Sequence, residues 1–197
     1  MVFHYNKTMQ DIAKIQSKLF PYSIGVYFDA ESETKIRTLW EVLAERGVAN
    51  YFYHSESRPH LTLATYNDLD LEKIDEILTS IGEKNAPIPI SFQYIGVFPT
   101  TRGIFLGPVV TKPLLKLHRQ IYQEITPYSI LSGIPYYLPE KWVPHCGVAV
   151  EVEPEHIPSV VQITDEMITF PFDATITEIG ITTNRSENQY CCYQLVG

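Results

Sequence analysis

The sequence predicts an α+β fold of two lobes, related by a pseudo-twofold axis and each made of a small antiparallel sheet backed by helices. Segments with the apolar spacing of helices follow segments that alternate like strands. The order strand, helix, strand, strand occurs twice, since Ile95 follows His60 by 35 residues and Ile179 follows His145 by 34. No linker or low-complexity stretch divides the 197 residues, so we expect one domain, 1–197, whose lobes share a core and a central cleft.

The first half of the chain contains three predicted helices and four predicted strands. The helices carry apolar residues every three or four positions, and Gly47 and Gly82 end two of them. The strands alternate between apolar and polar residues or are short apolar runs. In order, we expect a helix over 9–19, a strand over 22–30, a helix over 36–47, a strand over 59–66, a helix over 71–82, and strands over 88–99 and 103–110.

The second half repeats this organisation. A helix over 111–126 begins at the N-cap residue Thr111 and turns His118 inward with its apolar residues. A loop rich in turn formers covers the segment from 126 to 140, and its Tyr136 and Tyr137 are candidates for gating the cleft. After it we expect a strand over 141–150, a helix over 154–168, and strands over 173–183 and 189–196.

Composition restricts the partners. The formal net charge of −8 argues against tight binding to long nucleic acid, which depends on many Lys and Arg contacts to phosphates, but it is compatible with a small phosphate ligand. Three cysteines, two of them adjacent, fit a reducing compartment. The first 16 residues do not resemble a signal peptide, and no apolar run approaches the roughly 20 residues that span a bilayer. We therefore expect a cytoplasmic protein without a membrane partner.

Two short segments, "RPHLTLATY" and "KWVPHCGVAV", contain the candidate catalytic residues. On a strand His60 and Thr62 point to the same face, where an imidazole and a hydroxyl suit a phosphate group. His145 holds the matching place in the second lobe. A single histidine of this kind is more often a structural residue, but two at matching positions favour a paired site. Across a phosphodiester, one histidine can act as the general base and the other as the general acid.

These residues resemble the two His-x-Thr/Ser motifs of the 2H phosphoesterase superfamily, in the style of its bacterial 2'-5' RNA ligase-like and cyclic phosphodiesterase-like members. "PHLTL" and "WVPHCGVA" are similar to the motifs, and "YIGVFPTTRGIFLGPV", "LLKLHRQIYQEI" and "ITEIGITT" resemble the hairpin, helix and strand that accompany them. The resemblance implies a metal-independent hydrolysis, without cofactor, of a 2',3'-cyclic nucleotide, a cyclic RNA end or a short 2'-5'-linked nucleotide. It makes His60 and His145 the acid and base, in unassigned order, and Thr62 a donor to phosphoryl oxygens.

Gly147 departs from the family pattern, because it stands where the second motif has Thr or Ser. Cys146 is no substitute, since it points away from His145. Loss of one preorganised donor costs about 10²–10³ in rate, so a weakened enzyme is one interpretation. In another, the glycine leaves room for a water or a bulkier ligand group. The alternative function is a non-catalytic nucleotide- or phosphate-binding module with a degenerate site, and a third is an interaction protein with a vestigial groove.

Further substrate-binding candidates flank the motifs. Arg102 follows Phe98 in a turn, and Trp142 precedes the second motif. The arginine suits a phosphate, and the aromatic rings suit a nucleobase. The competing interpretation makes them a solvated cation and core aromatics. We expect no metal site, because His60, His145 and Cys146 do not have a known ligand spacing.

Overall fold

Eight antiparallel strands form one hydrogen-bonded sheet in the computed structural model, which describes residues 21–131, 135–183 and 188–197. The strand order is β5-β2-β1-β7-β3-β4-β6, and β8 pairs with β7 outside this path. The strands are β1 (Tyr22–Phe28), β2 (His60–Leu69), β3 (Ile88–Phe98), β4 (Gly103–Pro108), β5 (Ser129–Leu131), β6 (Cys146–Ala149), β7 (Phe172–Thr183) and β8 (Asn188–Gln194). The predicted α+β class with antiparallel pairing is therefore confirmed.

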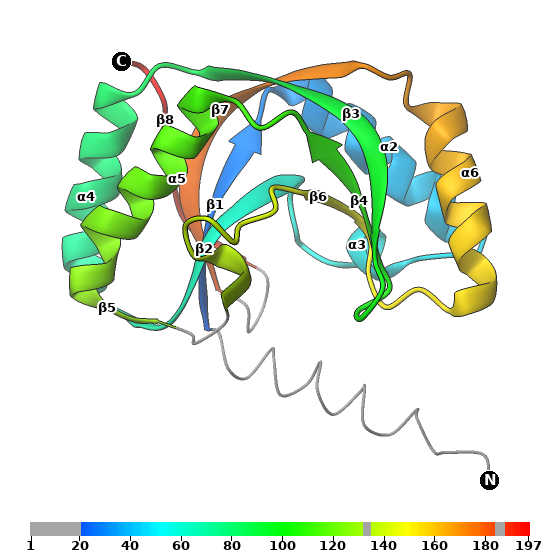
Figure 1. The fold of residues 1–197 in the computed structure, drawn as a ribbon, viewed down its shortest axis with the longest axis horizontal. Helices are drawn as coiled ribbons and strands as arrows, with labels where there is room; N and C mark the ends of the chain where they lie inside the picture. The colour runs from blue at the N-terminus through cyan, green and yellow to red at the C-terminus, as the bar shows by residue number, and fades with distance from the viewer. Residues whose placement is uncertain (1–20, 132–134, 184–187) are drawn as a thin grey trace, which may run out of the picture.

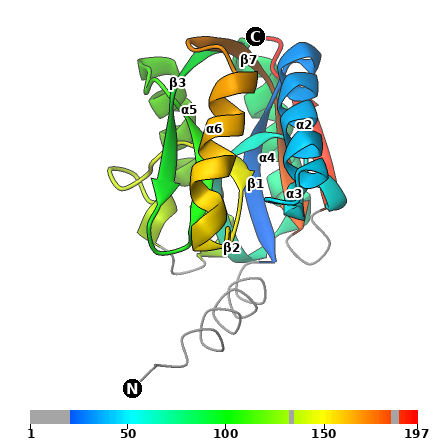
Figure 2. The same ribbon diagram turned by 90° about the vertical axis from the view of Figure 1, so that its right-hand side faces the viewer.

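The helices stand in two groups on either side of the sheet, α4 with α5 and α2 with α6 (Figure 1). In the view turned by 90°, α2 and α6 lie next to each other (Figure 2). Asp29, Asp70 and Thr111 cap the N-termini of α2, α4 and α5 with their side chains. The bounds are α2 (Ala30–Glu45), α3 (Tyr51–His54), α4 (Leu71–Lys84), α5 (Lys112–Ile125) and α6 (Ile157–Met167), with 3₁₀ turns η1 (Thr126–Tyr128), η2 (Pro135–Tyr137) and η3 (Pro154–His156).

The two lobes are not the two halves of the sequence as predicted, because β3 and β4 of the first half pair with strands of the second half; the lobes are joined through the long strand β7. Its first part, from Phe172 to Ile176, pairs with β3, the part from Ile176 onwards pairs with β1, and the part from Glu178 also pairs with β8. The first lobe therefore groups β5, β2, β1 and β8 around one end of β7, and the second groups β3, β4 and β6 around the other.

Several predicted elements need correction. The strand expected over 141–150 is only Cys146–Ala149, so His145 lies directly before β6. The loop expected between 126 and 140 contains η1, β5 and η2, and α3 was not predicted at all. The helix expected over 9–19 lies outside the described residues.

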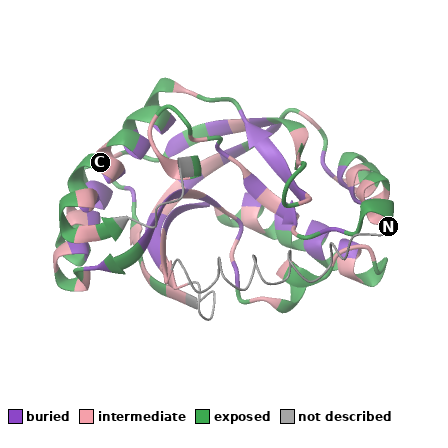
Figure 3. Cartoon of the chain, turned by 60° about the horizontal axis from the view of Figure 1, so that its bottom comes forward, coloured by how far each residue is buried: buried purple, intermediate pink, exposed green. Residues whose placement is uncertain are grey.

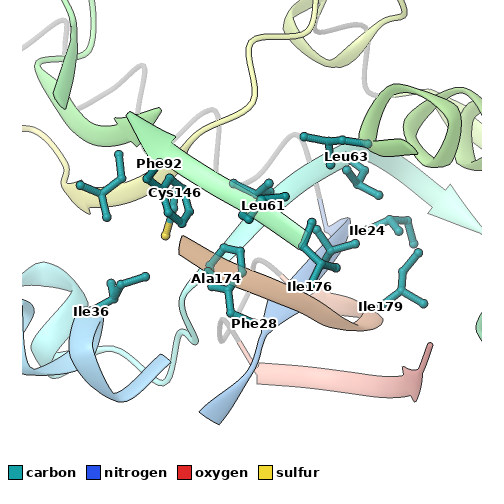
Figure 4. Close-up of a cluster of buried hydrophobic side chains, with 14 of the residues drawn as sticks. Ile24, Phe28, Ile36, Leu61, Leu63, Phe92, Cys146, Ala174, Ile176 and Ile179 are labelled. Atoms are coloured by element: carbon teal, nitrogen blue, oxygen red, sulfur yellow. The ribbon is translucent and has the colours of Figure 1, made fainter. Parts of the chain in front are cut away.

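The core lies between the sheet and its helices. Figure 3 shows buried residues along the strands and exposed ones on the outer faces of the helices. Leu61 and Leu63 of β2 are fully buried beside Ile24 of β1, and Cys146 belongs to the same cluster (Figure 4). Alternation then places His60 and Thr62 on the opposite face of β2, where both are half-buried. None of the described helices has the length and apolarity that a membrane span requires.

Candidate active site

His60 begins strand β2 with its ring fixed by the backbone. Its Nδ1 lies 2.6 Å from the carbonyl oxygen of Arg58. A carbonyl oxygen only accepts, so Nδ1 carries the proton and Nε2 is left for a ligand or a proton transfer. Burial lowers the pKa of His60, and the nearby charges of His145 and Arg58 lower it further. In the free protein the ring is thus biased towards its neutral form.

His145 is held in the same way in front of β6. Its Nδ1 donates to the carbonyl oxygen of Val143 at 2.7 Å, again two residues back along the chain. Burial lowers the pKa of His145 as well. Both histidines therefore present Nε2, and both favour the neutral state.

The two histidines are brought together by strands that are not neighbours in the sheet. β2 and β6 contact one another although no ladder joins them. The thiol of Cys146 is buried beside the backbone of His60, and the charge on His145 affects the pKa of His60. Cys146 thus faces the core, as expected, and connects the two motifs on the buried face of the sheet.

Thr62 is held at both its main chain and its side chain. Its carbonyl oxygen accepts from the indole Nε1 of Trp142 at 2.9 Å, and its side chain influences the pKa of the Tyr137 phenol. Tyr137 lies in η2, far from Thr62 along the chain. Its contact with the first motif was not foreseen beyond a general gating role.

The ring of Trp142, a predicted nucleobase platform, is engaged on one face within the protein. Its ring stacks on His118 of α5 at a centroid distance of 4.1 Å and an interplanar angle of 5°. One face and the N–H group are therefore engaged within the protein. The geometry favours the interpretation of Trp142 as a core aromatic that supports Thr62.

The space beside Gly147 is occupied by Phe52 of α3. A Cβ atom on Gly147 would lie 2.7 Å from Cζ of the Phe52 ring, closer than carbon atoms approach without displacement. Phe52 stacks on Trp40 at 4.7 Å, and Nε1 of Trp40 donates to the Gly147 carbonyl at 3.1 Å. The expectation that glycine leaves room there for a water or a ligand group is therefore wrong.

Phe98 lies against His145, while Arg102 lies in the turn beyond it. Phe98 meets the His145 ring edge-on at 4.9 Å and stacks on Phe105 at 4.3 Å. Arg102 adopts a φ of 53°, and its amide donates to the Phe98 carbonyl. Its Nε has no hydrogen-bond partner among the described residues. The turn thus places a cation close along the chain to an aromatic pair that contacts His145.

Arg58 anchors the first motif and was not singled out from the sequence. It forms ion pairs with Glu33 at 2.8 Å and Glu178 at 2.9 Å, and it lies over the ring of Tyr27. These carboxylates raise the pKa of the guanidinium despite its partial burial. Because the Arg58 carbonyl holds His60, this network fixes the histidine. Across the described ranges, no three His, Cys, Asp or Glu side chains gather as a metal site.

Comparisons with known proteins agree with this architecture. The model of the 2'-5' RNA ligase superfamily matches residues 28–188. Apo E. coli LigT superposes with a TM-score of 0.58 at 16% sequence identity, covering 90% of this chain and 98% of that one. TT0787 of Thermus thermophilus superposes with a TM-score of 0.59 at 14% sequence identity, covering 89% of this chain and 98% of that one. E. coli LigT complexed with 3'-AMP superposes with a TM-score of 0.55 at 15% sequence identity, covering 90% of this chain and 98% of that one. No curated protein matches the chain in sequence. At these identities the solved structures show a shared fold.

Proposed function

The chain belongs to the 2'-5' RNA ligase superfamily, as its two histidine motifs predict, and we propose that it is a metal-independent phosphoesterase. Membership supports a phosphoesterase-type function. We propose as substrate a 2',3'-cyclic nucleotide, a cyclic RNA end or a short 2'-5'-linked nucleotide. The observation that carries the proposal is the matched pair of histidines, each with Nδ1 bonded to a carbonyl and Nε2 left for chemistry.

The reaction divides the proton transfers between the two rings. One neutral histidine takes a proton from water, whose oxygen attacks phosphorus in line with the departing ribose oxygen. The bond from phosphorus to that oxygen breaks, and the other histidine, protonated, gives its proton to the leaving oxygen. His60 and His145 both fit either role. The Thr62 hydroxyl donates to a phosphoryl oxygen, whose charge grows in the transition state.

The second candidate function is a nucleotide- or phosphate-binding module without catalysis. It is supported by Phe52, which fills the place of the second hydroxyl beside Gly147. Such a module would bind 3'-nucleotides or inorganic phosphate through the first motif. The solved complex of E. coli LigT with 3'-AMP supports a small nucleotide as the ligand in either case. We also propose a cytoplasmic location, on the ground of the three free cysteines.

The test is turnover of a panel of 2',3'-cyclic nucleotides and 2'-5'-linked dinucleotides by the purified protein in EDTA. We expect hydrolysis that falls by about 10²–10⁴ in His60→Ala and in His145→Ala. His156→Ala, at the start of α6, is the matched control and should keep wild-type turnover. Absence of turnover across the panel, with retained binding of 3'-AMP, would favour the binding module. Turnover that survives both substitutions would contradict a two-histidine site.

A further inference from the structure

A row of side chains crosses the sheet on the face that carries His60. In the ladder of β1 with β2, Tyr27 lies opposite His60, and in the ladder of β1 with β7 it lies opposite Glu178. Residues directly opposite each other in antiparallel strands point to the same face. The rings of Tyr27 and His60 accordingly have centroids 6.1 Å apart. The carboxylate of Glu178 is therefore two strands away from His60, with an aromatic ring between them.

Arg58 spans this row from the chain in front of β2. Its guanidinium carbon lies 4.5 Å from the centre of the Tyr27 ring. Its Nη1 donates to Oε2 of Glu178 at 2.9 Å and to Oε1 of Gln189 at 2.9 Å. Its Nε and Nη2 donate to Oε2 of Glu33 at 3.1 Å and 2.8 Å. Residues of α2, β1, β7 and β8 thus hold one planar group, whose rigid fork of donors fits a single orientation.

The side chain of Arg58 fixes its backbone because the ladder between β1 and β2 stops short of it. That ladder ends at His60, where β2 begins, and Pro59 has no N–H group to extend it. The Arg58 carbonyl, which accepts from Nδ1 of His60 at 2.6 Å, therefore lies outside the ladder. Its position follows from the place where the guanidinium is anchored.

Glu178 is itself held in place from β8. Besides Arg58, its carboxylate accepts from Sγ of Cys192 at 2.9 Å and from Nε2 of Gln194 at 2.8 Å. Burial acts to raise the pKa of Glu178, but these hydrogen bonds outweigh it, so the pKa lies below its usual value. Glu178 is thus a permanent anion on a central strand, and a rigid point to which Arg58 is tied.

We propose that Glu178 is a positioning residue of the active site, which acts on His60 through Arg58. By fixing the guanidinium, it holds the Arg58 carbonyl against the Nδ1–H group of the ring. This bond keeps the neutral imidazole in the tautomer whose Nε2 has a free lone pair. A ring that loses the bond is able to carry its proton on Nε2, which then takes no proton from water.

Glu178 also offsets the charge that Arg58 places near His60. Burial lowers the pKa of His60, the bond to the Arg58 carbonyl partly opposes this, and the charges of the other histidine and of Arg58 lower the pKa further. Tyr27 carries no charge at neutral pH, because burial raises the pKa of its phenol to about 12. Without the Glu178 carboxylate, the Arg58 charge is less compensated, and the pKa of His60 should fall. A site that is merely loosened admits water, which would raise this pKa towards its ordinary value near 6.5.

The experiment uses Glu178→Ala, which removes the anchor, and Glu178→Gln, which keeps its shape and an acceptor oxygen. Glu76→Ala is the control, because it removes a carboxylate of equal charge from the surface of α4. Proton–nitrogen correlation spectra of the imidazoles, at about pH 8 where histidines are neutral, show which ring nitrogen carries the proton. The signal of His60 is assigned by its absence from His60→Ala. We expect only the Nδ1–H form in the wild type and in Glu76→Ala, and a mixture in Glu178→Ala. The pKa of His60, from the same signals, should fall in Glu178→Gln.

Turnover of a 2',3'-cyclic nucleotide measures the effect on catalysis. We expect Glu178→Ala to lower kcat by roughly tenfold to 10²-fold, as for a misplaced catalytic group, and Glu178→Gln to lose less. KM should change little, because the substitutions act on proton transfer and not on binding. In the His60→Ala background, neither substitution should lower kcat further. The inference rests on the proposed function for this effect on turnover, but not for the state of the imidazole, which is measured without substrate.

Three results would overturn the inference. The first is a His60 ring that keeps the pure Nδ1–H form in Glu178→Ala, and the second is a rise in its pKa in Glu178→Gln. The third is a loss in kcat that multiplies with that of His60→Ala, which would mean that Glu178 acts independently of the histidine. Should Glu178→Ala fail to fold, the pKa in Glu178→Gln decides. If the wild type turns no nucleotide over, the proposed function fails, and the spectra still test the role of Glu178.

Discussion

The two histidine motifs have the same backbone geometry and opposite surroundings. Each ring donates Nδ1–H to the carbonyl two residues earlier, which is a property of the local chain. Around His60 lie charged and hydroxyl groups, among them Arg58 and Thr62. Around His145 lie the rings of Phe98 and Phe105. The proton-transfer pair is thus nearly symmetric, whereas the hydroxyl two residues after the histidine is present in the first motif and replaced by Gly147 in the second.

Strand glycines allow the aromatic rings of the second lobe to pack directly against the sheet. A Cβ on Gly96 would lie 2.2 Å from the Phe105 ring, just as one on Gly147 would meet Phe52. At both positions an aromatic ring lies directly on the strand backbone, where any larger residue would displace it. In the second lobe, a strand glycine therefore marks where a ring approaches the sheet, which is a packing role.

The largest expected effect comes from Gly147→Ser, which restores the hydroxyl of the second motif and tests the packing role of the glycine. If the second motif lacked only a hydrogen-bond donor, the serine hydroxyl would restore that donor and raise activity. Because the new Cβ collides with Phe52, we expect instead a loss of about 1–3 kcal/mol in the free energy of unfolding and no gain in kcat. Urea denaturation and steady-state kinetics measure the two quantities.

The matched variant is Gly147→Ser combined with Phe52→Leu, compared with Phe52→Leu alone. Trimming the ring makes space for the serine, so the combined variant should recover part of the stability that Gly147→Ser loses. A serine that fits equally well beside the intact Phe52 ring would show that α3 is free to move, and the packing explanation would be wrong.

The first motif could be predicted from the sequence because strand alternation is a local property. Leu61 and Leu63 are buried, so the faces of His60 and Thr62 follow directly. The second motif was predicted less well, since the strand begins only at Cys146. Pro144 has no N–H to give to a ladder, which ends the pairing before His145.

The residues that complete the site had no local signal. Phe52 lies in a helix of four residues, too short for a periodic pattern, and Tyr137 lies in a 3₁₀ turn inside a predicted loop. Both reach the motifs through contacts between distant parts of the chain. The one available hint was Gly147, since a glycine within a strand often marks a close approach of another group.

A smaller effect tests how Thr62 is held from its main-chain side. Trp142→Phe keeps an aromatic ring against His118 but removes the indole N–H that donates to the Thr62 carbonyl. We expect a loss of about 1 kcal/mol in the free energy of unfolding, the net value of one hydrogen bond, and a modest fall in kcat. Trp40→Phe, which removes the corresponding bond to Gly147, is the control in the second lobe and should lower stability without the fall in kcat. Equal falls in kcat for the two variants would contradict a special role for Thr62.

The smallest expected effect concerns pH and distinguishes the two histidines. Burial keeps the pKa of His60 and of His145 below the value near 6.5 that an unfolded histidine has. Below that pH the unfolded chain binds protons that the folded chain does not, so stability falls as the pH drops through about 6.5 towards the folded pKa values. The pKa of His118 is lowered by burial too, and it contributes with the same sign in every variant.

Replacing either histidine with alanine should therefore make the fall in stability between about pH 7.5 and pH 5.5 shallower, measured by urea denaturation at each pH. The effect should be larger for His60→Ala, because the charges of Arg58 and His145 lower the pKa of His60 in addition to burial. Such a result would extend the contrast between the two lobes from packing to protonation. A larger effect in His145→Ala would mean that the pKa of His145, beside Phe98 and Phe105, is lowered more than that of His60. The charge of Arg58 would then have no measurable influence on His60.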